Sequence, residues 1–336
     1  MVSRGHNDDS GEDRLIARYF KQLANHPGAF GLDDDAAAIK PPPGCDLVLT
    51  CDAVVAGVHF FPDDPPEAVA RKALRVNLSD LAAKGAEPIG FLLVLALPDQ
   101  VDDDWLARFA PALGADAEHH SCPLFGGDTV RTPGPIVISI SAFGRVPHGK
   151  MLRRSGAKPG ERIVVTGTIG DAALGLALRN DPAAAAHWRI DQSAQDHLAE
   201  RYLVPQPRNA IAAALRDCAS AAMDVSDGLV GDVAKLCRAS GVAAKIVVER
   251  VPRSPAARAV LAAEPGLIET ILTGGDDYEV LASVPAGHVA SLQQTAAAAG
   301  LAVTEIGEVT AGEGQAVFLD RVGMPLAFKQ ASFSHF

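Results

Sequence analysis

The sequence predicts an α/β or α+β fold in which strands and helices alternate along both halves of the chain. In the N-terminal half, apolar runs typical of buried strands at residues 46–51 and 91–97 flank an amphipathic helical segment at 65–85. In the C-terminal half, apolar runs at residues 162–166 and 278–284 flank further helical segments. With 336 residues, 48% of them hydrophobic, the chain is long enough to form two domains with a core each.

The N-terminal half is predicted to begin with a helix. Residues 10–13 (SGED) resemble a capping box and open an apolar pattern that continues to Leu23. The apolar stripe of the segment at 65–85 ends at Gly85, a residue type typical of helix ends. The other elements predicted in this half are a strand at residues 46–51 before Asp52, a strand at 91–97, a helix at 102–119, a short strand leading into Gly126 and an alternating strand at 136–146.

Around residues 147–160 the sequence becomes basic and loop-forming. We therefore place the domain boundary there and predict domains at residues 1–148 and 149–336. Residues 181–195 are predicted to be a polar excursion, and Ser226 is either the N-cap of a helix, a phosphate ligand, or both. The elements predicted in this half are strands at 162–166, 221–223, 245–248, 278–284 and 302–309, and helices at 170–178, 210–217, 226–240 and 289–300.

Charge and cysteine usage exclude several classes of partner. The net charge of −11 argues against a nucleic-acid partner, because such proteins need a basic face. The five cysteines form no CxxC pair, which is typical of reduced thiols in a cytosolic protein. Residues 1–13 lack the apolar region of a signal peptide, and no apolar run reaches the length of a membrane span. We expect a cytoplasmic protein with no membrane partner.

Seven acidic motifs next to glycine, serine or threonine are the main functional signal. Carboxylates are hard oxygen ligands that suit magnesium, and adjacent glycines let backbone amides approach a phosphate. The motifs therefore predict a protein that handles a polyphosphate through metal ions. They are GLDDDA (31–36), LTCD (49–52), NLSD (77–80), GGDT (126–129), MDVSDG (223–228), GGDDYE (274–279) and, more weakly, GD (170–171).

The positions of these motifs in the sequence indicate which of them are ligands and which are ordinary turns. A single Gly-Asp pair is usually a turn, and three consecutive aspartates could form a solvated loop. However, Asp52, Asp128 and Asp224 each follow an apolar strand, and ligands of α/β folds collect at strand ends. Asn77 and Asp80 share one face of an otherwise apolar helix, either as an exposed polar face or directed at a ligand.

Other nucleotide-binding and catalytic motifs are absent. The sequence contains no GxxxxGK[ST] loop, no GxGxxG after a strand, no kinase HRD or DFG motif and no GxSxG elbow. His119 and His120 lie near Cys122, but no second ligand pair follows at the spacing of a zinc site.

The order of the motifs resembles the thiamine-monophosphate kinase family, within the AIR-synthetase-like ATP-binding proteins. The resemblance extends over nearly the whole chain, and VNLSDLAAKGAEP, MDVSDGL and GGDDYE together are very specific to it. The matching stretches are GLDDDAAAI (31–39), LTCDAVVAGVHF (49–60), KALRVNLSDLAAKGAEP (72–88), GGDTVRTP (126–133), RSGAKPGE (154–161), MDVSDGL (223–229), GGDDYEVL (274–281) and SFSHF (332–336).

Four positions depart from the family pattern. Asp33 stands where the family has glycine, and Cys51 replaces the middle residue of Thr-Thr-Asp. Asp276 replaces a glutamate, which leaves a substrate contact at that position in doubt. In the terminal motif, Ser332 replaces a glycine, while Phe333 keeps an aromatic residue at the second position.

The resemblance implies transfer of a phosphoryl group from ATP to thiamine monophosphate, giving thiamine diphosphate and ADP. It also implies an AIR-synthetase-like fold of two α/β domains, with the N-terminal domain forming a shared barrel-like sheet in a homodimer. No side chain is expected to act as a base or nucleophile. The implied site residues are Asp34, Thr50, Cys51, Asp52, Asp80, Asp128, Asp224 and Asp227 for several Mg²⁺ ions, Gly127, Asp128, Arg154 and Ser226 for ATP, and His59, Asp276 and Phe333 for the thiamine compound.

Other functions within the same superfamily remain as alternatives. Selenophosphate synthetase would need a reactive residue in a glycine-rich N-terminal segment, and the hydrogenase-maturation dehydratase would need a C-terminal cysteine. This chain has neither feature. An AIR-synthetase-like activity and a non-catalytic nucleotide-sensing protein are the further alternatives, and retention of every motif aspartate counts against the second.

Overall fold

The computed structural model describes residues 14–99 and 101–333. It divides into two compact units, each assembled from separate stretches of the chain. The first unit comprises Met1–Pro42, Cys51–Leu74 and Pro88–Phe143, and the second comprises Pro43–Thr50, Arg75–Glu87 and Gly144–Phe336. The division of the chain at residues 148 and 149 into functional domains stays a prediction.

The first unit is built on a four-stranded sheet with the strand order β1-β4-β2-β3. The strands β2 and β3 are parallel neighbours, and a helix connects them, which gives a βαβ unit. The elements are β1 (Cys45–Val55), α2 (Pro66–Ala83), β2 (Glu87–Leu97), α3 (Asp103–His119), β3 (Leu124–Arg131) and β4 (Val137–Pro147). Four of them cross the division, since residues 45–50 of β1, 75–83 of α2, 144–147 of β4 and the first residue of β2, Glu87, belong to the second unit.

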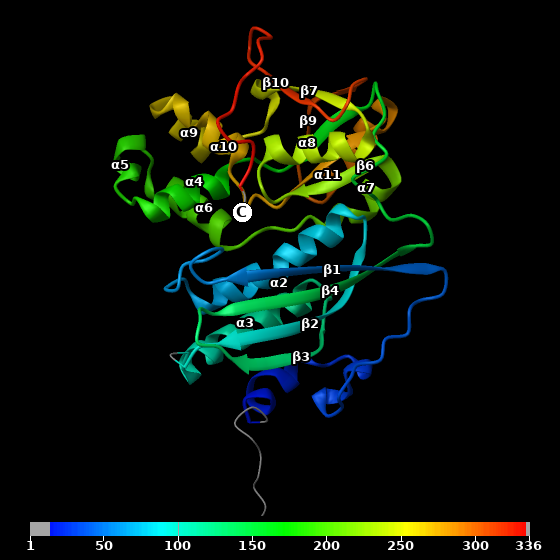
Figure 1. Ribbon diagram of the computed structural model, residues 1–336, viewed down its shortest axis with the longest axis vertical. Helices are drawn as coiled ribbons and strands as arrows, with labels where there is room; N and C mark the ends of the chain where they lie inside the picture. The colour runs from blue at the N-terminus through cyan, green and yellow to red at the C-terminus, as the bar shows by residue number, and fades with distance from the viewer. Residues whose placement is uncertain (1–13, 100, 334–336) are drawn as a thin grey trace, which may run out of the picture. The chain divides into compact units, whose positions relative to one another are not determined.

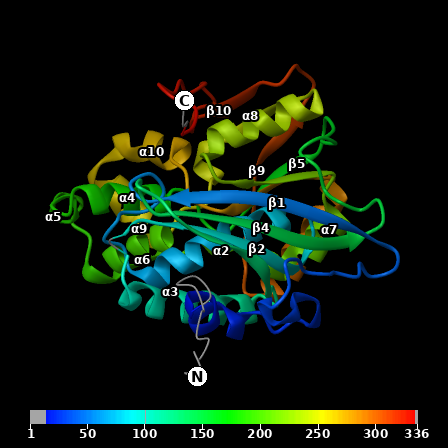
Figure 2. The same cartoon turned by 60° about the horizontal axis from the view of Figure 1, so that its bottom comes forward.

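One face of this sheet is packed against α2 and α3, whereas among the described residues of the unit no α-helix lies on the opposite face (Figure 1, Figure 2). Residues 24–39 pack against Leu92 and Phe143 at one end of this opposite face, which is called the uncovered face below. Along β4, buried residues alternate with half-buried ones, as expected for a strand with one face against a core. The helices α2 and α3 lie on the packed side, and Asp102 caps α3 by accepting a hydrogen bond from Trp105 N at 3.0 Å. The uncovered face carries the half-exposed apolar side chains of Val94 and Val130.

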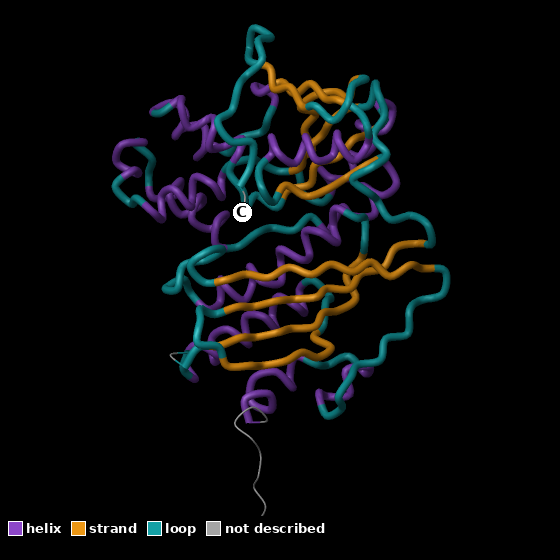
Figure 3. The backbone as a smooth tube through the Cα atoms, viewed as in Figure 1, coloured by secondary structure: helices purple, strands orange, loops and turns teal. Residues whose placement is uncertain are grey.

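The second unit contains a six-stranded sheet with the order β10-β7-β9-β5-β8-β6. Figure 3 draws the strands of both sheets in orange. All neighbouring pairs are antiparallel except β10 and β7, which are parallel. The strands are β5 (Arg162–Thr166), β6 (Ala221–Val225), β7 (Ala243–Val247), β8 (Glu279–Val284), β9 (Val303–Thr310) and β10 (Ala316–Leu319). The helices are α4 (Asp171–Asn180), α5 (Ala184–Trp188), α6 (Gln192–Leu203), α7 (Ala212–Cys218), α8 (Leu229–Ser240), α9 (Pro255–Ala263), α10 (Ile268–Thr273) and α11 (Val289–Ala298).

Both faces of this sheet are covered, so β6 and β8 are buried along their whole length and are mainly apolar, with Asp224, Glu279 and Ser283 as the polar exceptions. Successive residues of β5 enter different cores, because side chains alternate across a strand. Ile163 and Val165 pack with α4, α6, α8 and α9, whereas Val164 packs with α7 and α11. The described residues contain no helix that is long and apolar enough to cross a membrane.

Most predicted elements agree with the structure, but α9, α10 and β10 were not predicted. Asp52, Asp128 and Asp224 were expected to follow strands, but they lie within β1, β3 and β6, because each strand continues past its aspartate. Three further differences concern single elements. Residues 181–195 were expected to be a polar excursion, but they form α5 and the start of α6, since α6 buries Leu198 and Tyr202 on one face. The helix expected at residues 226–240 begins only at Leu229, with Gly228 as its N-cap, so Ser226 does not cap it. The helix predicted from the SGED motif begins outside the described residues, and Ile16–Phe20 is a π-helical turn.

The close approach of β2 and β3 generates a prediction about Gly127. A Cβ atom at this position would lie 1.8 Å from the carbonyl oxygen of Leu93, which belongs to the backbone of the neighbouring strand. We expect Gly127→Ala to lower the free energy of unfolding by about 1–3 kcal/mol, since the strands must separate to admit the methyl group. Urea denaturation followed by circular dichroism measures this change.

The adjacent Gly126 provides the control, because a Cβ there would meet only the end of a side chain, Leu92 Cδ2, at the ordinary contact distance of 3.4 Å. Gly126→Ala should leave the denaturation midpoint close to that of the native protein. If both substitutions lowered the free energy of unfolding equally, the close contact between Gly127 and Leu93 would not be the cause of the destabilisation.

Candidate nucleotide and metal site

Three predicted metal ligands of the second unit, Thr50, Asp80 and Asp224, lie close together. Asp80 on α2 accepts a hydrogen bond from the Thr50 hydroxyl on β1, and the preceding Ser79 donates from Oγ to Asp224 Oδ2 at 3.0 Å. Asp224 lies on β6, between the buried residues Met223 and Val225. The strand β1, the helix α2 and the strand β6 therefore present the Thr50 hydroxyl and two carboxylates to the same region.

The carboxyl group of Asp224 is held in an unfavourable environment for its charge. Burial and, to a smaller extent, the negative charge of Asp80 together raise its pKa from 3.8 to about 8. The hydrogen bond from Ser79 and the charge of Lys84 oppose this rise but are smaller. Two carboxylates that destabilise each other in this way are a fitting donor pair for a divalent cation.

Lys84 adds a positive charge that the sequence analysis missed. It lies one helical turn after Asp80, and its Nζ donates to the carbonyl oxygen of Ala222 at 3.0 Å. Burial lowers the pKa of Lys84, while the charge of Asp224 raises it. The i, i+4 spacing from Asp80 on a helix was the signal in the sequence that could have identified it.

A cavity of about 480 Å³ borders these groups in the second unit. Three of its side chains are cationic: Lys84, Arg153 and Arg154. Apolar atoms from β1 and from Met151 complete much of the wall. The full lining is Leu47, Val48, Leu49, Thr50, Asp80, Leu81, Lys84, Met151, Arg153, Arg154, Ser155 and Ala239. An apolar wall combined with convergent cations and a carboxylate suits an organic anion that binds together with a metal ion.

Four of the predicted ligand contacts meet at the loop before α8. Asp276 N donates to Ser226 O at 2.8 Å, and Phe333 N donates to Asp227 O at 3.0 Å. The structure thus brings predicted nucleotide, metal and substrate residues together through backbone hydrogen bonds. The Phe333 side chain is 50% exposed at this place.

Asp227 has a cationic neighbour that the sequence analysis did not consider. Its carboxylate forms an ion pair with Lys235, which also lies 2.8 Å from the buried Asp232. Any cation that binds Asp227 must therefore compete with or supplement the ammonium group of Lys235.

The remaining predicted residues lie in the first unit. Cys51 and Asp52 on β1 are exposed, as is Asp128 on β3, where it is paired in register with Val94. The Cys51 thiol lies 3.6 Å from Ser139 Oγ and 3.3 Å from Ser141 Oγ on β4. Among residues 14–99 and 101–333, no three His, Cys, Asp or Glu side chains are grouped as a metal site.

Two further residues of the first unit have local roles. His59 accepts a hydrogen bond at Nδ1 from Val55 N at 3.1 Å, which fixes its ring orientation. Asp34 is exposed in the loop after residues 27–32, and the additional Asp33 forms an ion pair with Lys21. This ion pair accounts for Asp33 without a metal ion.

The weakest acidic motif, Gly170-Asp171, is part of a buried network. Asp171 accepts hydrogen bonds from Thr168 Oγ1 at 2.6 Å and from Ser254, and His197 Nε2 lies 3.2 Å away. Its carboxylate is fully buried, and its hydrogen bond from Ser254 connects α4 to the segment before α9. This aspartate is structural, in agreement with its low weight in the sequence analysis.

The fold and the motif order are those of a known family. Models of the N-terminal and C-terminal domains of AIR synthase related proteins match residues 33–146 and 158–320. The chain therefore belongs to the AIR synthase related proteins, which confirms the predicted two-domain fold class.

Curated relatives and solved structures narrow the assignment. A thiamine-monophosphate kinase of Caulobacter vibrioides is 43% identical over 90% of this chain and 85% of its own length. The crystal structure of thiamine-monophosphate kinase from Stenotrophomonas maltophilia K279a aligns with a TM-score of 0.80 and 36% identity, covering 90% of this chain and 94% of its own. The structure of AaThiL complexed with AMPPCP and TMP aligns with a TM-score of 0.75 and 30% identity, covering 94% and 98%. Within the AIR synthase related proteins, the chain is a member of the thiamine-monophosphate kinase family.

The raised pKa of Asp224 generates a prediction about stability and pH. Its carboxyl binds a proton more tightly in the folded protein, with a pKa of about 8, than in the unfolded chain, with its ordinary value of 3.8. The metal-free protein therefore loses stability as the pH rises through this window. Asp224→Asn is neutral at every pH and keeps an acceptor for Ser79, so its thermal midpoint relative to that of the native protein should rise between about pH 4 and about pH 8 and stay level above it.

Thermal unfolding in the presence of a chelator measures this difference. Asp46→Asn is the control, because hydrogen bonds from Gly149 and His148 lower the pKa of this exposed carboxyl. It should show no gain at high pH. A constant difference between Asp224→Asn and the native protein across the window would show that Asp224 stays ionised in the folded state.

Proposed function

We propose that this protein transfers a phosphoryl group from ATP to thiamine monophosphate, producing ADP and thiamine diphosphate. The observation that carries the proposal is the cavity in which Lys84, Arg153 and Arg154 meet the Thr50–Asp80 pair, in a chain that is 43% identical to a thiamine-monophosphate kinase. The relative of known structure contains AMPPCP and TMP, which agrees with a nucleotide and a phosphate ester as the two substrates.

The donor set fits magnesium. Asp80 and Asp224 raise each other's affinity for a positive charge, and the hydroxyl of Thr50 is a hard oxygen ligand beside them. The residues that we propose as Mg²⁺ ligands are Asp34, Thr50, Cys51, Asp52, Asp80, Asp128 and Asp224, with Asp227 for a further ion. When bound, magnesium ions neutralise charge on the phosphoryl oxygens and favour in-line transfer.

The chain's own residues would bind and orient the two substrates. We assign Arg154 to the nucleotide phosphates because a planar guanidinium matches phosphate geometry, with Gly127, Asp128 and Ser226 as further nucleotide contacts. His59, Asp276 and Phe333 are assigned to the thiamine compound. A phosphate monoester has a second pKa near about 6, so it is already a nucleophile at neutral pH and no catalytic base is required.

Product analysis tests the reaction directly. The purified protein, incubated with ATP, Mg²⁺ and thiamine monophosphate, should form thiamine diphosphate and ADP in equal amounts. Asp52→Asn should reduce turnover by at least about 10²-fold, because a charge that holds a metal beside the transferred phosphate is worth several kcal/mol. Asp46→Asn on the same strand is the control and should retain native turnover. ADP formation without thiamine diphosphate would exclude this acceptor.

We also propose a homodimer and a cytoplasmic location. The uncovered sheet face of the first unit exposes Val94 by 41% and Val130 by 43%, which suits a sheet completed by a second subunit. The five cysteines are unpaired in the structure, as expected in a reducing compartment.

The dimer leads to a prediction for solution measurements. Light scattering should give about twice the chain mass of 34.9 kDa. Val130→Lys places a charge on the uncovered sheet face and should shift the protein to the mass of one chain. Val322→Lys, at a side chain that is 76% exposed in the second unit, should leave the mass unchanged. A native protein that stays monomeric at high concentration would contradict the proposed assembly.

A further inference from the structure

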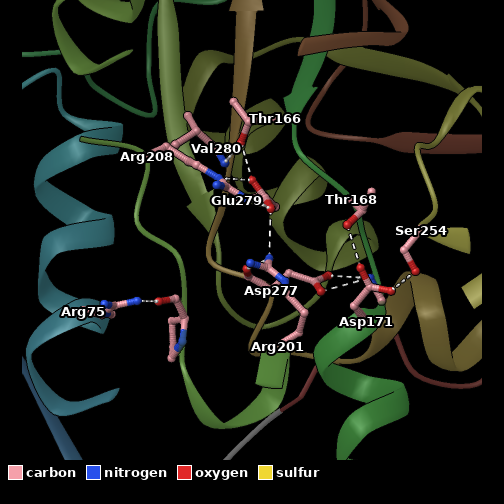
Figure 4. A network of polar contacts seen from close by, with 12 residues as sticks. Arg75, Thr166, Thr168, Asp171, Arg201, Arg208, Ser254, Asp277, Glu279 and Val280 are labelled. Carbon is pink, nitrogen blue, oxygen red and sulfur yellow. Dashed lines mark hydrogen bonds and ion pairs between the residues drawn. The ribbon is translucent and has the colours of Figure 1, made fainter. Parts of the chain in front are cut away.

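A fully buried carboxylate, Glu279, begins β8 and is held by two arginines (Figure 4). Arg201 Nη2 lies 2.9 Å from Glu279 Oε1, and Arg208 donates to both carboxylate oxygens, with Nε 2.6 Å from Oε2. Thr166 Oγ1 donates to Oε2 at 2.7 Å and accepts from Val280 N at 2.8 Å. Every carboxylate oxygen of Glu279 thus has a fixed partner.

The segment before β8 is held in an unusual backbone conformation. Asp276 and Tyr278 have positive φ values of 71° and 50°, which cost non-glycine residues of order 1 kcal/mol each. Arg201 Nη2 also donates to the carbonyl oxygen of Asp277 at 3.2 Å, and Gly170 N lies 2.9 Å from both carboxylate oxygens of Asp277. The arginine that binds Glu279 therefore also fastens the residue between the two strained ones.

Residues 274–278 also form hydrogen bonds with the end of β6 and the loop before α8, which contains the predicted nucleotide contact Ser226. Asp276 N donates to Ser226 O and Tyr278 N donates to Val225 O, both at 2.8 Å. Asp277 and Glu279 are buried, whereas Asp276 between Gly275 and Asp277 is half-buried and accessible. The buried ion pairs of Glu279 thus support an accessible aspartate, Asp276, next to Ser226.

The same network continues to α2. Arg208 lies in the connection between α6 and α7, and this connection is tied to α2 at two points: Arg75 Nη1 donates to Pro205 O at 3.0 Å, and Asn209 Nδ2 donates to Leu78 O at 3.1 Å. Asp80 follows Leu78 by two residues. The connection between α6 and α7 therefore contacts both the helix that carries the proposed metal ligand and, through Arg208 and Glu279, the segment that carries Asp276.

We propose that Glu279, Arg201 and Arg208 are positioning residues that set residues 274–278 for recognition of the phosphate acceptor. The proposal rests on the proposed function in taking Asp276 as an acceptor contact. The buried ion pairs hold the strained loop in one conformation. This matters because displacement of a binding group by even about 1 Å strongly lowers the efficiency of an enzyme. None of the three residues needs to touch a substrate.

Glu279→Gln is the main test, since it keeps the shape of the side chain and removes the charge that both arginines bind. Hydrogen exchange at the amides of Asp276 and Tyr278 should accelerate by about tenfold or more, because local opening becomes easier. The KM for the acceptor should rise by about tenfold, while the KM for ATP changes by less than about twofold. Unchanged protection of the two amides would overturn the proposal, and so would an equal rise of both KM values.

Glu161→Gln is the matched control. Glu161 is also buried, and it accepts hydrogen bonds from Ser220 Oγ and from Ser283 Oγ near the other end of β8, each at 2.6 Å. Its substitution should lower thermal stability without altering the exchange of the two amides. A loss of protection in this control equal to that in Glu279→Gln would reduce the network to general stabilisation and overturn the proposal.

A second pair of variants keeps the test decisive if Glu279→Gln does not fold. Thr166→Val removes one donor to Glu279 and should shift amide exchange and acceptor KM in the same direction, whereas Thr166→Ser should behave as the native protein. The exchange readout does not depend on turnover. If the native protein formed no thiamine diphosphate, the proposed function would fail while the effect on the two amides still decided the role of the network.

Discussion

The buried charge of Glu279 is the constraint on which the arrangement of the second unit depends. A carboxylate without access to water must be paired, and here two guanidinium groups and a hydroxyl satisfy it. The arginines come from α6 and from the connection that follows it, so the pairing fixes where the sheet and these segments meet. Ion pairs of this kind add little net stability, but they select one arrangement over its alternatives.

Two other buried carboxylates of the second unit, Asp171 and Asp224, have different environments. Asp171 is satisfied by hydroxyl groups and serves the packing of α4, whereas burial and the neighbouring Asp80 destabilise the ionised form of Asp224. This contrast separates a structural carboxylate from one that is available to a cation. The lysines near Asp224 and Asp227 lessen the electrostatic cost in the absence of metal.

Much of the fold was predictable because its elements carry strong local patterns. The strand at residues 162–166 has the predicted bounds, and α3 begins directly after Asp102 as its capping side chain suggests. The prediction failed at α5 and α6, where polar residues outnumber the few that are buried. Packing against α4 and α9 makes this segment helical, and such contacts leave no periodic signal strong enough to read. Ser226 was misassigned as a possible cap because Gly228 allows the chain to turn before the helix begins.

By itself, the sequence determined the type and order of most elements and the set of acidic motifs that mark the family. These features depend on residues a few positions apart, whose periodicity and turn preferences are local properties. Only the tertiary structure decided the charge state favoured by Asp224, the pairing of Glu279 with Arg201 and the approach of Asp276 to Ser226. Burial and electrostatic interaction depend on the surroundings of a side chain, and here those surroundings come from segments distant in the chain.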